Sequence, residues 1–84
     1  MREVYSNVLK RFFQKNLCQS RKALGISQEE MAHRLSMAPR SYLEMEHGKT
    51  CCSGLTLARY LIYVCHDPMK FLEELRSEFE NSVA

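Results

Sequence analysis

The 84-residue sequence contains few residues that break helices, with only three glycines and two prolines, and it has no tryptophan. No apolar run approaches the ~20 residues of a membrane-spanning helix, and the first residues lack the apolar stretch of a signal peptide. We therefore expect a cytoplasmic protein without membrane contact. Hydrophobic residues make up 45% of the chain. This content favours one small folded domain over residues 1–84 and excludes a disordered chain.

The four cysteines do not form a disulfide pattern. Cys18 and Cys65 fall inside helical patterns, and Cys51 and Cys52 are adjacent, a spacing at which cysteines do not easily pair. The one conceivable metal cluster would add His66 to these thiols, but clustered motifs such as Cys-x-x-Cys are missing. We expect reduced thiols, no metal and no other cofactor.

The sequence also lacks the patterns of catalysis. It has no serine–histidine–aspartate or cysteine–histidine set at recognisable spacing, no carboxylate pair in an apolar setting and no glycine-rich phosphate loop. We expect a protein that is not an enzyme, and no small-molecule ligand is evident.

Charge is unevenly distributed along the chain. Residues 1–70 contain eleven Lys and Arg against six Asp and Glu, a net charge of +5, and residues 71–84 have a net charge of −3. A basic body is compatible with attraction to nucleic-acid phosphates. Solvated surfaces are often charged in this way, so charge alone does not define the function.

Apolar spacing predicts an all-α fold of five helices, which span about residues 6–24, 27–35, 39–48, 53–66 and 67 onward. Residues 1–12 are expected to extend the first helix, and residues 76–84 to form an acidic C-terminal tail. The residues expected to face the core are Leu9, Phe13, Leu17, Ser20, Leu24, Met31, Ala32, Leu35, Tyr42, Met45, Leu57, Tyr60, Leu61, Val64, Phe71, Leu72 and Leu75.

Residues 27–48 carry the clearest functional signal. Ser27 is a good N-cap and Glu30 completes a capping-box pattern. Pro39 suits a first helical turn, and Gly48 suits a left-handed helix end. Two short helices joined by a tight turn have the shape of a helix-turn-helix, whose second helix fits the major groove of DNA.

A longer pattern surrounds this unit. It reads Phe13-x-x-x-Leu17-x-x-x-Arg21-x-x-x-Gly25-x-Ser27-Gln28-Glu29-Glu30-Met31-Ala32 and continues through Leu35, Tyr42, Met45-Glu46-x-Gly48-Lys49 and Ser53-x-x-Thr56-Leu57. Over about residues 13–75 it resembles the lambda-repressor-like helix-turn-helix family, which includes Cro and the xenobiotic-response-element-type bacterial and phage regulators. Ser36 departs from the family, which prefers glycine at this turn position.

The resemblance implies roles for individual residues. Arg21 and Glu46 look like the internal ion pair of the family, and Gln28 looks like its phosphate-contacting residue, whose backbone N–H lies at a helix N-terminus. Lys49 and Thr50 fall in the loop that usually touches backbone phosphate.

The positions at which the family reads base edges are occupied by Pro39, Arg40, Leu43 and Glu44. Arg40 can bond O6 and N7 of guanine together. Leu43 and Ser41 can touch a thymine methyl group or a phosphate. Glu44 either accepts from N4 of cytosine or is a solvated acid.

The resemblance thus implies sequence-specific binding of double-stranded DNA by a small stand-alone, Cro-like repressor. Such a protein would bind a palindromic operator as a homodimer. Two apolar stripes could form the dimer surface: Val4, Tyr5, Val8 and Phe12, or Phe71, Leu75 and Phe79. The second stripe is favoured because dimers of the family commonly meet near their C-terminal helices. The alternative is that both stripes fold back onto the core of their own chain.

A different class of function stays open, namely a helix-turn-helix module for protein interaction or dimerisation, such as an antitoxin or mobile-element accessory. Glu44 and the small number of cations in the loop that follows favour it. Ser27-Gln28, Arg40 and Lys49 favour DNA.

Overall fold

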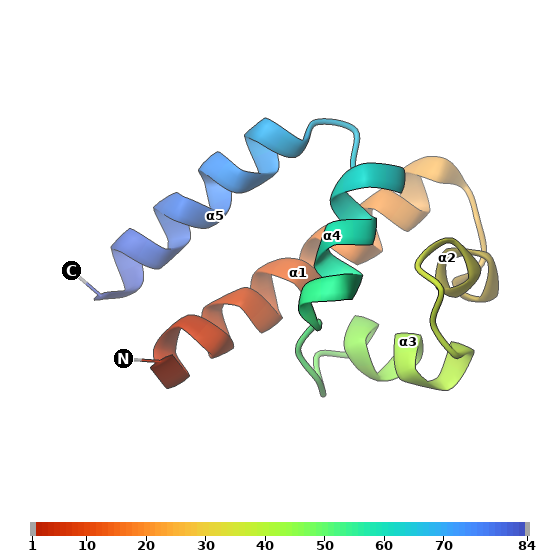
Figure 1. The fold of residues 1–84 in the computed structure, drawn as a ribbon, viewed down its shortest axis with the longest axis horizontal. Helices are drawn as coiled ribbons and strands as arrows, with labels where there is room; N and C mark the ends of the chain where they lie inside the picture. The colour runs from red at the N-terminus through yellow and green to blue at the C-terminus, as the bar shows by residue number, and fades with distance from the viewer. Residues whose placement is uncertain (1, 84) are drawn as a thin grey trace.

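The computed structural model describes residues 2–83, which form five helices and no strand (Figure 1). The predicted all-α fold is confirmed. The helices are α1 (Arg2–Leu24), α2 (Gln28–Arg34), α3 (Pro39–Glu46), α4 (Gly54–Tyr63) and α5 (Pro68–Val83).

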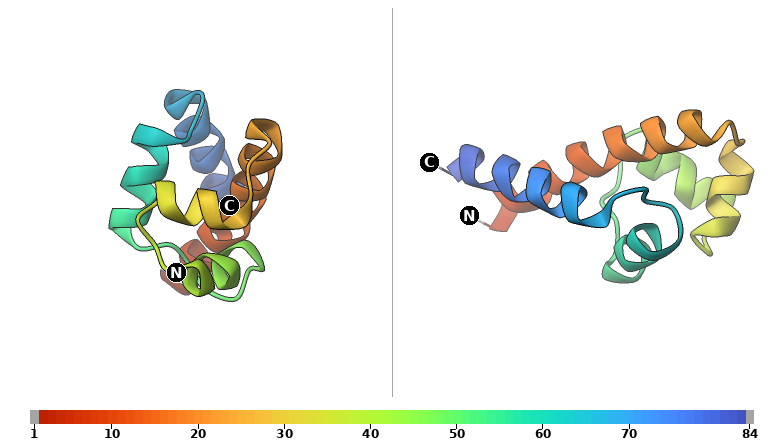
Figure 2. Two further views of the ribbon diagram at one scale, coloured as in Figure 1. Left: turned by 90° about the vertical axis from the view of Figure 1, so that its right-hand side faces the viewer. Right: turned by 90° about the horizontal axis from the view of Figure 1, so that it is seen from above.

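The long helix α1 organises the molecule. Figures 1 and 2 show α5 running beside the N-terminal half of α1, while α2 and α3 pack around its C-terminal half and α4 crosses it. Both chain ends consequently lie at the same end of the molecule, away from α2 (Figure 2).

Three aromatic rings join α1, α4 and α5 at the centre of the core. Phe13 is fully buried and lies edge-on to Tyr60, with ring centroids 5.0 Å apart, and Phe71 lies 5.3 Å from Tyr60. Offset and edge-on aromatic pairs of this kind stabilise a core beyond the area that they bury. The Tyr60 hydroxyl shares a 2.8 Å hydrogen bond with the hydroxyl of Ser20, so it is satisfied although the ring is buried.

Most of the expected core is buried or half-buried, but two predicted core residues are exposed. Leu24 is 45% exposed because it is the last residue of α1 and lies beside the turn at Gly25, where Ile26 packs against the core instead. Leu72 is 44% exposed because Phe71 and Leu75, one helical turn apart, already cover the side of α5 that faces α1. The buried members are Phe13, Leu17, Met31, Ala32, Leu35, Tyr42, Met45, Tyr60, Phe71 and Leu75.

The two terminal apolar stripes pack against each other within one chain. Tyr5 meets Phe79 edge-on at 5.0 Å, and Phe12 lies 5.1 Å from Phe71. Phe71 and Leu75 are only 4% and 7% exposed. The predicted dimer surface of Phe71, Leu75 and Phe79 is therefore wrong, because these side chains pack against α1 of the same chain.

The same seam explains the helix lengths. Helix α1 begins at Arg2, so it includes residues 2–12 of the segment expected to extend the first helix, and Tyr5 in this segment packs edge-on against Phe79 of α5. Residues 76–83, predicted as an acidic tail, continue α5 for the same reason. Met1 and Ala84, the outermost residues of the two predicted terminal segments, lie outside the described residues.

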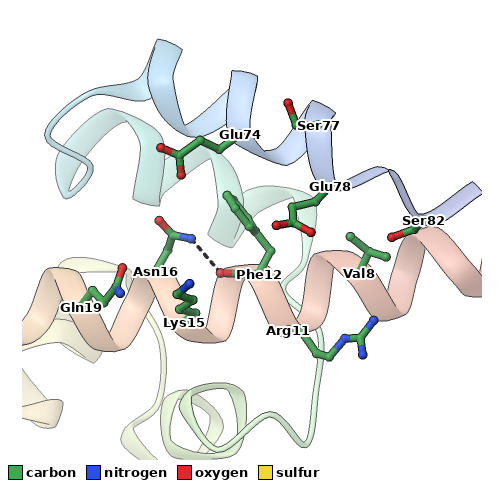
Figure 3. Close-up of a pocket in the computed structure, with 10 residues that line it drawn as sticks. All are labelled: Val8, Arg11, Phe12, Lys15, Asn16, Gln19, Glu74, Ser77, Glu78 and Ser82. Carbon is green, nitrogen blue, oxygen red and sulfur yellow. Dashed lines mark hydrogen bonds between the residues drawn. The ribbon is translucent and has the colours of Figure 1, made fainter. Parts of the chain in front are cut away.

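A groove of about 440 Å³ runs along this seam (Figure 3). Arg11 and Lys15 of α1 form one wall, and Glu74 and Glu78 of α5 form the other. All four side chains are exposed, whereas Phe12 forms the half-buried floor. The groove is therefore a solvated channel between two oppositely charged helix edges.

The helix ends follow the signals in the sequence. The Ser27 hydroxyl accepts the Glu30 N–H at 3.1 Å, as predicted, but the Glu30 carboxylate accepts a hydrogen bond from Arg34 at 3.3 Å, so only this half of the predicted capping box is present. Ser53 caps α4 and Asp67 caps α5 in the same manner, through 3.1 Å bonds from the N–H groups of residues 56 and 70. These contacts satisfy first-turn N–H groups that have no partner inside their own helix.

Three turn residues have left-handed backbone angles: Ser36 (φ 54°), Gly25 (φ 66°) and Gly48 (φ 78°). Gly48 ends α3 as predicted, with its N–H bonded to the Met45 carbonyl at 3.1 Å. A Cβ atom at Gly48 would lie only 2.7 Å from the side-chain oxygen of Gln14. Gly48 is thus required by its φ angle, while the Gln14 amide is the end of a flexible side chain that can shift away from an added Cβ atom.

Substitutions at two of these positions should act in opposite directions. Ser36→Gly removes a left-handed strain of about 1–2 kcal/mol, offset by about 0.5–1 kcal/mol of extra entropy in the unfolded chain, so stability should rise by up to about 1 kcal/mol. Gly48→Ala introduces that strain and should lower stability by about 1–2 kcal/mol or more. Urea unfolding followed by circular dichroism measures both. A midpoint that falls in Ser36→Gly would contradict the strain assigned to Ser36.

Candidate nucleic-acid interface

The turn between α2 and α3 is held by backbone hydrogen bonds. The Met37 N–H reaches the Ala32 carbonyl at 2.9 Å, and the Ser36 N–H reaches the His33 carbonyl at 3.0 Å. On the inner side, Met31 and Leu35 pack in the same core as Tyr42. The two helices therefore form one rigid unit with a fixed angle between them.

Helix α3 has a buried side and an exposed side. Tyr42, Met45 and Glu46 are buried. With 3.6 residues per turn, Arg40 and Glu44 then lie on the opposite side, and both are exposed. A helix that shows polar side chains outward along its whole length can enter the major groove without unfolding any part of the domain.

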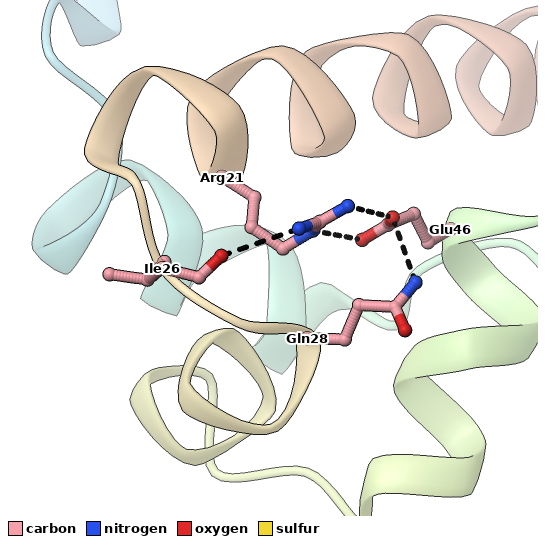
Figure 4. A network of polar contacts seen from close by, with 4 residues as sticks. All are labelled: Arg21, Ile26, Gln28 and Glu46. Carbon is pink, nitrogen blue, oxygen red and sulfur yellow. Dashed lines mark hydrogen bonds and ion pairs between the residues drawn. The ribbon is translucent and has the colours of Figure 1, made fainter.

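The back of α3 is tied to α1 by a charged network (Figure 4). Arg21 donates to both carboxylate oxygens of Glu46, at 3.0 Å and 2.9 Å. Arg21 also donates to the Ile26 carbonyl at 3.3 Å, and the Gln28 amide donates to Glu46 at 3.2 Å. The network joins α1, the turn after it, the first residue of α2 and the last residue of α3.

The electrostatics of this network favour the charged pair. Burial of the Glu46 carboxyl opposes its ionisation, but the hydrogen bonds led by the one from Arg21 outweigh burial and hold the pKa of Glu46 below its ordinary value. The hydrogen bond with Glu46 raises the pKa of Arg21. The Glu46 side chain is 6% exposed and the Arg21 side chain is 18% exposed, so water screens the pair only in part.

Three of the residues assigned to DNA contact gather in one place. Ser41, Glu44 and Thr50 line a groove of about 220 Å³ between α3 and the loop that follows it. Lys49 is exposed in the same loop. Hydroxyl groups and a carboxylate beside a cation can bond the edges of bases and the adjoining phosphates.

The other assigned residues lie apart from this groove. Pro39 and Arg40 are exposed in the first turn of α3, and Leu43 is half-buried further along the helix. The Gln28 side chain is directed inward to Glu46, so its amide N–H donates within the protein (Figure 4). The backbone N–H of Gln28 lies at the start of α2, which is the position that the resemblance associates with a phosphate contact. Of the groups of Gln28, only this N–H fits that expectation.

The structure adds one cation that the sequence did not indicate. Lys10 lies on α1 one turn from Ser6 and one turn from Gln14, so the three residues share a face. The Cys51 thiol donates to the Ser6 carbonyl at 3.9 Å, and Gly48 lies against Gln14. The loop 48–51 therefore runs along this face, on which Lys10 lies between the two contacts. Helical spacing alone marks Lys10 only as a residue outside the core.

The cysteines and other metal-binding side chains stay dispersed. Within residues 2–83, no three side chains of the types His, Cys, Asp and Glu come close enough to hold a metal ion. All four cysteines are free and half-buried. Over the same residues, none of the five helices has the length and apolar content needed to cross a membrane.

The geometry agrees with a comparison against families of known proteins. The helix-turn-helix family model matches residues 19–63, more than half of the chain and the segment that contains α2, the turn, α3 and α4. The chain belongs to this lambda-repressor-like helix-turn-helix family, which consists of DNA-binding domains. Comparisons with individual curated proteins and with solved structures gave no match.

Removal of the Glu46 carboxylate should destabilise the fold. Glu46→Ala leaves the partly buried Arg21 without its partner, and the loss should be about 3 kcal/mol at pH 7. A depressed carboxyl pKa contributes stability above the unfolded-state value near 4.5, and this contribution disappears as pH falls through the folded-state pKa. The difference between wild type and variant should therefore shrink below about pH 4.5.

Urea titrations at several pH values measure this effect. Glu30→Ala is the matched control, because its ion pair with Arg34 is solvent-exposed and should contribute no more than about 0.5 kcal/mol. Equal midpoints for the Glu46 and Glu30 variants at pH 7 would rule out a structural role for the pair.

Proposed function

We propose that the protein is a sequence-specific double-stranded DNA-binding regulator of the repressor type, which acts in the cytoplasm and inserts α3 into the major groove. The observation that carries the proposal is the division of α3 into a side locked to α1 and α2 and a side left free. A locked helix loses little freedom on binding, so contacts with bases are formed at low entropic cost.

Arg40 is the residue proposed to read a base. It lies in the first turn of α3, and the N-terminal residues of a recognition helix reach deepest into the groove. Its planar guanidinium can pair with O6 and N7 of guanine. Glu44, one turn further on, fits N4 of cytosine, so the two side chains suit neighbouring base pairs.

Phosphate contacts are assigned to the edge of α3. Lys49 and Thr50 are exposed in the loop after the helix, and Lys10 stands beside that loop on α1. The backbone N–H of Gln28 supplies a further contact at the start of α2. These groups fix position on the duplex without reading its sequence.

A Cro-like mode of action follows from the size of the surface. One α3 spans only a short half-site, and two copies related by two-fold symmetry would read a palindrome about one DNA turn apart. We therefore include homodimerisation in the proposal. Selection of bound sequences from a random duplex library tests the whole proposal, and enrichment of an inverted repeat is the expected result.

The second candidate is a protein-interaction module with little affinity for DNA. Glu44 on the free side of α3 favours it, because a carboxylate there repels phosphate. Glu29 and Glu30 are also exposed in the first turn of α2.

Substitutions should separate base reading from phosphate contact. Arg40→Ala should weaken binding to the selected site by about 1–3 kcal/mol and relax the preference at one base pair. Lys49→Ala and Lys10→Ala should weaken binding to all sequences nearly equally, and each should reduce the salt slope by about one. Fluorescence anisotropy with matched and mutated duplexes measures these effects.

Lys70→Ala serves as the control, because Lys70 lies on α5 and pairs with Glu74 at 4.0 Å. It should bind like the parent protein. If Arg40→Ala binds every duplex as tightly as the parent does, the base-reading role of Arg40 is wrong.

Salt dependence distinguishes the two candidate functions. A DNA-binding protein should retard a mixed pool of duplexes at low salt and release it as salt rises, with a slope of about −0.9 per phosphate contact. Gel retardation of such a pool over a range of salt concentrations provides the test. A protein that leaves the pool unshifted even at low salt would be assigned to the protein-interaction class.

A further inference from the structure

The groove between α3 and the loop that follows it is lined by four sulfur-containing side chains. They are Met37 from the turn before α3, Met45 from α3 itself, and Cys51 and Cys52 from the loop. A spacing motif such as Cys-x-x-Cys cannot reveal this set, because its members come from three separate segments. We call this space of about 220 Å³ the sulfur groove.

The two cysteine thiols of the sulfur groove are close neighbours. Burial raises the pKa of the Cys52 thiol, and the charge and side-chain hydrogen bond of Cys51 raise it further. The Cys51 thiol also donates to the Ser6 carbonyl at 3.9 Å, so the loop holds it beside α1. A disulfide would need the two sulfur atoms about 2.05 Å apart, which adjacent residues do not easily reach. An ion bound to both sulfur atoms leaves them further apart.

The ligand types decide which ion the sulfur groove suits. Thiolate and thioether sulfur atoms are soft ligands, and together they favour Cu(I) over harder ions, which prefer carboxylates and water. A zinc site usually takes four ligands from Cys, His, Asp and Glu, and within residues 2–83 not even three such side chains come close enough. Methionine lies outside that set, so a Cu(I) site of two cysteines and a methionine is compatible with the absence of a zinc site.

Met37 is the better third ligand of the two methionines. Met45 is 2% exposed and is part of the central core, so its side chain is already committed to packing. Met37 is half-buried and packs only at the edge of that core. Its unbranched, flexible side chain can turn toward the groove without opening a cavity.

We propose that the sulfur groove binds one Cu(I) ion through the Cys51 and Cys52 sulfur atoms and the Met37 thioether. Each bound thiol gives its proton to water, and copper remains Cu(I), so binding needs no oxidant or reductant. The ion joins the turn before α3 to the loop after it and therefore stabilises the folded chain. This inference does not depend on the proposed function, because the site is tested without DNA.

The test measures the transfer of copper from a coloured chelator. The Cu(I) complex of bicinchoninate is titrated with reduced protein in oxygen-free buffer, and the loss of colour gives the copper that the protein has bound. Wild type should remove one Cu(I) per chain. Cys51→Ser and Cys52→Ser should each weaken the affinity by about 100-fold, and Met37→Leu by about tenfold. Circular dichroism checks that all variants stay folded.

The matched control is the double variant Cys18→Ser/Cys65→Ser, which keeps only the two thiols of the sulfur groove. Cys18 lies on α1 and Cys65 follows α4, and both are half-buried and free. The double variant should bind copper like wild type. Cu(I) should also raise the urea midpoint of wild type and of the double variant, but not that of Cys51→Ser.

Four results would overturn the inference. They are a wild-type protein that removes no copper from bicinchoninate, a variant of Cys51 or Cys52 with wild-type affinity, a Met37→Leu variant with wild-type affinity, and a double control variant that loses the copper. Gel retardation of duplexes is measured separately. A protein that binds Cu(I) as expected but retards no duplex would refute the proposed function while the copper site stands.

Discussion

The ion pair between Arg21 and Glu46 is the constraint on which the orientation of α3 depends, because α1, the start of α2 and the end of α3 meet there. It connects α1 to the last residue of α3, and the Gln28 amide adds the start of α2. A partly buried ion pair contributes little net stability compared with apolar packing, but an unpartnered charge in the same place is costly. The main effect of the pair is therefore to make other orientations of α3 less stable. Any arrangement that separates the two side chains leaves unpaired charges in a low-dielectric environment.

The two halves of α1 have different tasks. The C-terminal half carries Arg21 and supports the helix-turn-helix, and the N-terminal half packs along α5. Phe71 lies outside the segment matched by the family model, yet it packs in the same aromatic cluster as Phe13 and Tyr60. Residues beyond the matched segment thus complete its core. Because Phe71 and Leu75 of α5 are buried, the stripe that they form is not available to a partner.

Local signals in the sequence predicted the fold well. Ser27, Ser53 and Asp67 cap their helices through bonds within a few residues, and the φ angles of Gly48 and Ser36 follow from turns of fixed shape. The failures are tertiary in origin. Spacing identifies an apolar stripe but not the surface that buries it, so the stripe of Phe71 and Leu75 was assigned to a partner. Likewise, the position of Lys10 beside the loop 48–51 depends on how α1 packs against that loop. A local sequence pattern carries no information about such packing.

Under the proposed function, a single copy would have limited affinity for DNA. The side of α3 that faces outward presents Arg40 together with the carboxylate of Glu44. Lys49 is exposed in the loop that follows α3, and Lys10 lies on the face of α1 along which this loop runs. Each neutralised phosphate contributes only about one unit to the salt slope, so two such cations give weak general attraction to DNA. Affinity for a specific operator would then require that two copies each contact the correct bases of one half-site. An interface that is weak in free solution suits this arrangement, because the second copy binds at a high effective concentration only where both half-sites are present.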